Sequence, residues 1–117
     1  MRPLALFAHS DFVSLHLPLS NKSRNLITAG VIQKASHPLI LINTSRAEIV
    51  EEGALEAGFR SGAIWACGLD VYRERELPAL RDERVLISPH IAGLSLESTR
   101  RMRQELIKRI EGAIEHL

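Results

Sequence analysis

The sequence has little cysteine and no long apolar run, and both absences narrow the class of protein. Cys67 is the single cysteine among 117 residues, so a disulfide framework is excluded and a reducing compartment is expected. No apolar stretch is long enough to cross a bilayer. The N-terminal MRPLALFAHS turns polar too soon for a signal peptide. We therefore expect a cytoplasmic globular protein.

An excess of charge of one sign is also lacking. Lys and Arg number 15 against 14 Asp and Glu, a net charge of +1, which gives no electrostatic basis for binding nucleic acid or an anionic membrane. The one basic cluster, Arg100, Arg101 and Arg103, is interrupted by Glu97 and Glu105. That alternation is typical of a solvated helix face.

A recognisable metal-binding pattern is lacking as well. His9, Asp11 and His16 are close in sequence, but nothing in their spacing fixes a coordination geometry, so no metal site is predicted. Cys67 lies inside an apolar run, which favours a small core residue over a nucleophile.

What the sequence does contain is a series of short apolar runs that end in polar residues. The clearest is LILINTSR, residues 39–46, a pattern typical of a buried parallel strand. Similar runs predict strands at 10–19, 63–71 and 84–88. With 45% hydrophobic residues, the chain is expected to form one globular domain.

Helical patterns separate these runs. The spacing predicts a helix from about residue 26 with Thr28 as a possible N-cap, and a second one after residue 47 with Glu51 and Glu52 in its first turn. Gly62 is the expected stop of the second helix. Residues 72–83 are expected to form a charged loop, and a long helix covers about 96–116. Its expected buried stripe comprises Met102, Leu106, Ile110 and Ile114. This alternation predicts an α/β fold, a partial doubly wound parallel sheet of about four strands with flanking helices.

Each expected strand ends in a polar or charged group: His16, Arg46, Asp70 and His90. In open α/β sheets, ligands bind outside the carboxyl ends of the strands. Arg46 is therefore placed where a guanidinium can meet an anion, and its fork of donors suits a carboxylate. Four such endings at one edge of a sheet predict a functional site.

Four sequence blocks give this pattern a family resemblance. HLPLS at 16–20, INTSRAEIVEEGAL at 42–55, SGAIWACGLDV at 61–71 and SPHIAG at 88–93 resemble the D-isomer-specific 2-hydroxyacid dehydrogenases in order and approximate spacing. The resemblance covers about residues 10–117. It implies that residues 1–117 are the C-terminal portion of a Rossmann-type NAD(P)-binding domain.

The resemblance also implies roles for particular residues. Arg46 matches the arginine that binds the substrate carboxylate and polarises its keto group, and His90 matches the general acid/base. Imidazole suits that task because it titrates near neutral pH. Asp70 matches the residue near the nicotinamide amide. Arg46, Asp70 and His90 also match positions that bind NAD or NADP. The other positions that resemble the wall of the cofactor site are Leu17, Pro18, Thr44, Ser45, Ala92 and Gly93, of which the last two form one turn with Ile91.

The chain departs from the family in two ways. Its seven glycines nowhere show the G-x-G-x-x-G spacing that binds pyrophosphate at a helix N-terminus. The family also has a glutamate that bonds the catalytic histidine, and an ungapped count from Asp70 places Arg75 there. A one-residue insertion restores a glutamate as Glu74 or Glu76, and Glu76 is favoured as the catalytic equivalent.

These observations leave several functions open. By resemblance, the chain belongs to an NAD(P)-dependent oxidoreductase that transfers hydride between a D-2-hydroxy acid and its 2-keto acid, and it is expected to be incomplete alone. Alternatives are a non-catalytic scaffold or interaction module, which Arg75 favours, and a truncated reading frame, which the DNA upstream of Met1 would reveal. The strand at 11–17 would be a bare sheet edge. The chain is therefore expected to form a homo-oligomer or to need the missing N-terminal half.

Overall fold

The computed structural model describes residues 3–88 and 96–115. Its centre is a four-stranded parallel sheet with the strands in sequence order, β1-β2-β3-β4. The strands are Phe12–Leu15, Leu39–Asn43, Ile64–Leu69 and Val85–Ile87. The predicted parallel sheet of about four strands is thus confirmed, although each strand is shorter than its apolar run.

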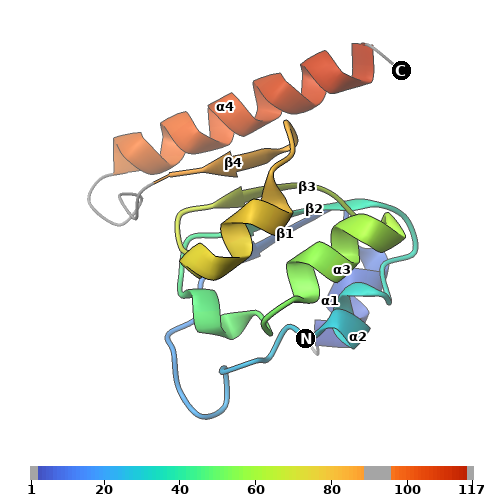
Figure 1. The fold of residues 1–117 in the computed structure, drawn as a ribbon, viewed down its shortest axis with the longest axis vertical. Helices are drawn as coiled ribbons and strands as arrows, with labels where there is room; N and C mark the ends of the chain where they lie inside the picture. Colours follow the sequence, from blue (N-terminus) through green and yellow to red (C-terminus); the bar gives the residue numbers. More distant parts are fainter. Residues whose placement is uncertain (1–2, 89–95, 116–117) are drawn as a thin grey trace.

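Helices cover both faces of this sheet (Figure 1). On one side lie α1 (Pro3–His9), α2 (Ala29–Ile32) and α3 (Ala54–Ser61), which share a core with Val13, Leu41 and other inward residues of the strands. On the other side lies α4 (Leu96–Glu115), whose Met102, Leu106 and Ile110 pack on Ile40, Ile42 and Ala66. The strands alternate between the two cores because their side chains alternate between the two faces.

The central strands are buried on both faces. All five residues of β2 are buried, as are five of the six residues of β3. Such strands read as continuous apolar runs because no face meets water. β1 differs: Val13 and Leu15 are buried, whereas Phe12 and Ser14 are exposed.

Glycine determines the position of α3 in two ways. Gly62 ends the helix with φ +82°, as expected, because that left-handed conformation suits a residue without a Cβ. Gly58 lets the helix approach β3 closely, since a Cβ there would lie 2.6 Å from Ile64 Cδ1 and 3.0 Å from Ile32 Cγ2. Helix α3 can therefore pack this closely on the sheet only because Gly58 has no side chain.

Several predicted boundaries are wrong. Strand β1 ends at Leu15 and does not reach Leu17, and α2 is only four residues long, with Thr28 as its N-cap and Ile27 bridged to Val50. Helix α3 begins at Ala54, after a short 3₁₀ helix, Ala47–Ile49.

Two further expectations also fail. The charged loop at 72–83 contains a 3₁₀ helix, Glu74–Leu80. Ile114, predicted to be buried, is 54% exposed because the buried stripe of α4 ends at Ile110.

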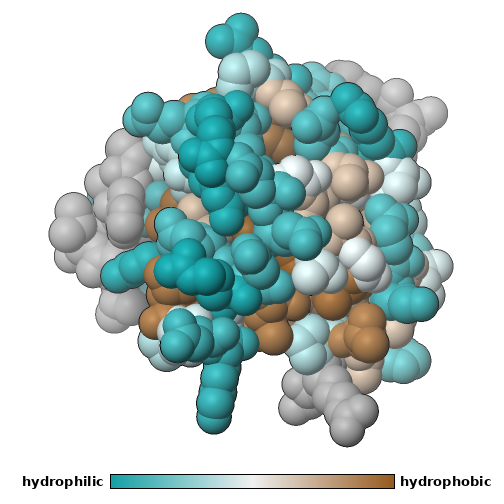
Figure 2. Space-filling model, turned by 60° about the horizontal axis from the view of Figure 1, so that its bottom comes forward, coloured by the Kyte–Doolittle hydropathy of each residue, from teal (hydrophilic) through white to brown (hydrophobic). Residues whose placement is uncertain are grey.

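Figure 2 shows one face of the molecule. Hydrophilic side chains run across most of it, and apolar atoms lie between them in separate patches. Hydrophobic and hydrophilic residues are thus interspersed on this face.

Candidate functional site

The end of β2 turns sharply around one buried amide. Asn43 is 1% exposed, and its Oδ1 accepts hydrogen bonds from the Ser45 amide at 3.0 Å and the Ser45 hydroxyl at 2.8 Å. Its Nδ2 donates to the Arg46 carbonyl at 3.0 Å. The side chain thus ties the chain back on itself immediately beyond the strand and presents Arg46, whose side chain is exposed.

The end of β3 carries a buried carboxylate. Asp70 is 1% exposed, and its backbone N–H donates to the Asn43 carbonyl at 3.0 Å. The Ser88 hydroxyl, just past β4, donates to Asp70 Oδ1 at 2.6 Å and lies 3.2 Å from Met102 Sδ. A hydrogen bond to a carboxylate is stronger than a neutral one. The ends of β2, β3 and β4 are therefore linked by polar contacts.

A hollow of about 300 Å³ lies between the ends of β2 and β3. Its lining residues are Arg46, Ala47, Glu48, Asp70, Val71, Tyr72 and Glu74. The structure thus brings Arg46 and Asp70 together, and Arg46 is the single cation among these lining residues. A guanidinium in this position can hold a small carboxylate at the carboxyl edge of the sheet.

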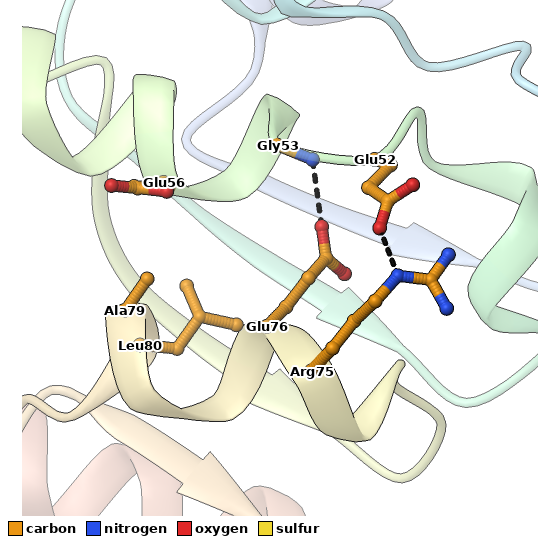
Figure 3. Close-up of a pocket in the computed structure, with 7 residues that line it drawn as sticks. All are labelled: Glu52, Gly53, Glu56, Arg75, Glu76, Ala79 and Leu80. Atoms are coloured by element: carbon orange, nitrogen blue, oxygen red, sulfur yellow. Dashed lines mark hydrogen bonds and ion pairs between the residues drawn. The ribbon is translucent and has the colours of Figure 1, made fainter.

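The two candidate acids lie in different places. Glu74 lines the hollow with Arg46. Glu76 instead accepts a hydrogen bond from the Gly53 amide at 2.7 Å, and its other oxygen lies 3.4 Å from Arg73 Nη1. Figure 3 shows Glu76 pointing toward the start of α3. The structure therefore places Glu76 at a helix N-terminus, where a carboxylate satisfies an unpaired N–H group.

Arg75, which an ungapped count from Asp70 places where the family has its acid, pairs with Glu52 (Figure 3). The hydrogen bond between the two side chains, and after it the attraction of their opposite charges, lowers the pKa of the Glu52 carboxyl and raises the pKa of Arg75. Both side chains are exposed. The charge of Arg75 is thus balanced locally.

The remaining cofactor-wall candidates are less enclosed. Leu17 and Pro18 are exposed, and the Pro18 carbonyl accepts a hydrogen bond from the Ser23 hydroxyl at 2.7 Å. Thr44 and Ser45 are half-buried, with the Ser45 hydroxyl committed to Asn43.

Three predicted site residues, His90, Ala92 and Gly93, lie outside the described residues. His16, at the end of the expected first strand, is exposed, and its Nε2 is 2.7 Å from Ser14 Oγ.

The described part of the chain shows no group of three or more potential metal ligands. Within residues 3–88 and 96–115, none of the helices has the length and apolar character needed to cross a membrane. Burial raises the pKa of the Cys67 thiol to about 12, which is the behaviour of an inert core thiol.

Two polar residues of the site were not predicted from the sequence. They are Asn43, the last residue of a buried strand, and Ser88, whose hydroxyl reaches Asp70. The signal for Asn43 is a polar residue within an apolar run, because a buried amide must find hydrogen-bond partners. Ser88 gives no comparable signal, since its partner is 18 residues away.

Comparison with known proteins identifies the family of the chain. Residues 2–92 match the family described as D-isomer specific 2-hydroxyacid dehydrogenase, NAD binding domain. The chain is 38% identical over 112 residues to a hydroxypyruvate reductase from Thermotoga maritima, covering 90% of this chain and 36% of that protein. A glyoxylate reductase from Korarchaeum cryptofilum is 37% identical over 101 residues, covering 83% of this chain and 30% of that protein.

Solved structures show the same relationship. A D-lactate dehydrogenase from Aquifex aeolicus, complexed with NAD and lactic acid, superposes with a TM-score of 0.72 at 26% identity, covering 99% of this chain and 40% of that chain. A D-isomer specific 2-hydroxyacid dehydrogenase from Xanthobacter autotrophicus, in complex with NADPH and MES, has a TM-score of 0.69 at 33% identity, covering 76% and 30%. The chain spans about a third of the length of the curated relatives it matches. It belongs to the D-isomer-specific 2-hydroxyacid dehydrogenase family, and residues 2–92 match the family's NAD-binding domain.

Proposed function

We propose that this chain supplies the substrate-facing half of the NAD(P)-binding domain of a 2-hydroxyacid dehydrogenase. The substrate is a small D-2-hydroxy acid or its 2-keto acid, and the setting is the cytoplasm. The observation that carries the proposal is the shared hollow of Arg46 and Asp70 at the carboxyl ends of β2 and β3. In this family, such a pairing of cation and buried carboxylate lies where substrate and nicotinamide meet.

The described residues fit the nicotinamide end of NAD or NADP. Asp70 is a buried carboxylate at a strand end, held by Ser88, and it can accept hydrogen bonds from a carboxamide. Leu17, Pro18, Thr44 and Ser45 contribute the neighbouring wall. The bound nicotinamide would supply or accept the hydride at C2 of the substrate.

The residues of the chain have distinct tasks in this scheme. Arg46 binds the substrate carboxylate through two parallel hydrogen bonds and orients C2. His90 gives a proton to the carbonyl oxygen during reduction and takes it back in the reverse direction. A carboxylate from the 74–76 segment stabilises the protonated imidazole. The sequence favours Glu76 for this role, whereas Glu74 is the acid that lines the hollow with Arg46.

A chimera tests this scheme directly. The matching 112 residues of the Thermotoga maritima hydroxypyruvate reductase are replaced by this chain, and oxidation of NADH by hydroxypyruvate is followed at steady state. We expect turnover. Arg46→Gln and His90→Asn should each lower kcat/KM by about a hundredfold or more. A folded chimera that binds NADH without turnover would favour the scaffold function, for which Arg75 is the supporting feature.

The isolated chain gives a second test. With NADH and glyoxylate, hydroxypyruvate or pyruvate, we expect no robust oxidation, because none of its glycines has the spacing of a pyrophosphate-binding turn. Robust oxidation would show that the chain is competent alone.

The partner in this scheme covers the free edge of β1. Strand β1 pairs with β2 alone among the described strands, and Phe12 on it is 53% exposed. In the classical winding order, the strand that leads into the glycine-rich turn pairs at this edge. Either that half of the domain or a second copy of the chain would satisfy the unpaired backbone groups.

A further inference from the structure

We propose that Asn43 is a positioning residue for the anion-binding guanidinium of Arg46. The proposal rests on the function proposed above and names how this chain sets the geometry of its own substrate-carboxylate subsite. Asn43 itself does not line the hollow. It acts through the backbone of the two residues that follow Thr44.

The geometry is that of a fully used buried amide. Three hydrogen bonds of 2.8–3.0 Å leave Asn43 toward Ser45 and Arg46. Both ends of the amide are committed, the oxygen as acceptor and the nitrogen as donor. An aspartate would lack the donor, and an apolar residue would lack both functions.

These hydrogen bonds fix the backbone of Ser45 and Arg46, from which the Arg46 side chain extends. The Arg46 side chain is exposed, and its described hydrogen bond, from Nη1 to the Ser45 carbonyl at 2.7 Å, goes to the same turn. Within the described residues, no buried side chain forms a hydrogen bond or ion pair with the Arg46 guanidinium. Its position depends on the backbone of residues 44–46, and Asn43 is the side chain that fixes that backbone.

The turn is also anchored to the neighbouring strand. The Asn43 carbonyl accepts the Asp70 N–H at 3.0 Å, so the residue that shapes the Arg46 turn is joined to the residue expected to meet the nicotinamide. One residue thus sets the distance between the two functional side chains of the hollow. A misplacement of about 1 Å in such a site can cost about a hundredfold in rate.

Binding of oxalate to the 117-residue chain tests the proposal. Oxalate is a small dicarboxylate probe, and its affinity is measured by NMR titration at the Arg46 Nε–Hε signal. Asn43→Leu preserves the approximate shape of the side chain but removes all three bonds. We expect it to weaken oxalate binding about tenfold and to speed hydrogen exchange of the Ser45 amide.

Thr28→Ala is the matched control. It removes the N-cap of α2, whose hydroxyl accepts the Val31 N–H at 3.1 Å, so it lowers stability without touching the Arg46 turn. It should leave both oxalate affinity and Ser45 exchange unchanged. If Asn43→Leu also leaves both unchanged, the proposal is overturned.

The wild-type chain and Arg46→Gln separate the role of Arg46 from the role of Asn43. If the wild-type chain does not bind oxalate, or if Arg46→Gln binds it equally well, the proposed role of Arg46 is wrong. In that case Ser45 exchange still decides whether Asn43 fixes the backbone of residues 44–46: faster exchange in Asn43→Leu supports that step, and unchanged exchange overturns it.

Discussion

The central strands β2 and β3 and the edge strand β1 belong to one sheet but are stabilised very differently. Strands β2 and β3 have a strand on each side and a helix layer over each face. Strand β1 pairs with β2 alone among the described strands and buries the side chains of one face. Within the described residues, the comparison shows an interior that is covered on all sides at β2 and β3 and an open edge at β1.

The largest effect expected in the interior is the alkaline response of Cys67 on β3. Its pKa is about 12 in the folded chain against 9.0 as the ordinary value. Below pH 9 both folded and unfolded states hold the proton, whereas above pH 9 the unfolded state releases it first. Stability should therefore fall by about 1.4 kcal/mol per pH unit from 9 to 12, roughly 4 kcal/mol in total. Urea unfolding measures this.

Cys67→Ala is the control for that response. The variant is destabilised at neutral pH, but it lacks the thiol, so its stability should fall less steeply between pH 9 and 12. If the stability of both proteins falls equally steeply with pH, the pKa of Cys67 is not raised by burial in the folded chain.

A pair of core and edge truncations compares the two regions directly. Leu41 on β2 is 0% exposed, and Leu41→Ala should cost about 3 kcal/mol through lost burial and a cavity. Phe12→Ala on β1 removes a half-exposed ring and should cost less than about 1 kcal/mol. Chemical unfolding checks both. Equal costs would mean that β1 is covered in solution.

Two glycines sharpen the contrast between packed and open surfaces. Gly58→Ala places a Cβ against Ile64 and Ile32 and should cost about 2 kcal/mol. Gly112 on α4 has no heavy atom within 4 Å of such a Cβ, so Gly112→Ala should stabilise by about 0.5–1 kcal/mol. Thermal melts of both variants measure the difference. Two effects of the same sign would show that the approach of α3 to β3 is looser than described.

The smallest effect on stability is expected at the free edge of β1, and there the measured quantity is the association of the chain with itself. A lysine on an exposed edge opposes strand pairing. We therefore expect sedimentation velocity to show association of the wild-type chain and its loss in Phe12→Lys. Leu4→Lys, an exposed position on α1, is the control and should still associate. A monodisperse, cooperatively melting wild-type monomer would contradict the free-edge proposal.

The strands could be predicted from the sequence because burial on two faces leaves an apolar run that any short window detects. The caps Thr28 and Gly62 are also local signals, and both are confirmed. The start of α3 was misplaced because Glu51 acts at a distance: its carboxylate accepts the Ala29 N–H at 3.2 Å, at the start of α2. Local helix rules assign such an acid to its own helix.

The site was predictable where chemistry and strand ends coincide, as at Arg46 and Asp70. It was not predictable where a long-range contact decides. Glu74 and Glu76 are equivalent by spacing, yet only the fold shows that Glu76 meets Gly53, 23 residues earlier. Ser88 and Asp70 likewise need the pairing of β3 with β4 to meet.

The strand order has a consequence for how the chain folds. Every neighbouring pair in the sheet is parallel and consecutive in sequence, so no pair can form as a hairpin, and each must wait for a crossover segment to be placed. Ladder formation is therefore non-local throughout, which slows folding relative to a chain of hairpins. Because α4 follows all four strands in sequence, the face that it covers would stay exposed during synthesis until α4 itself is made.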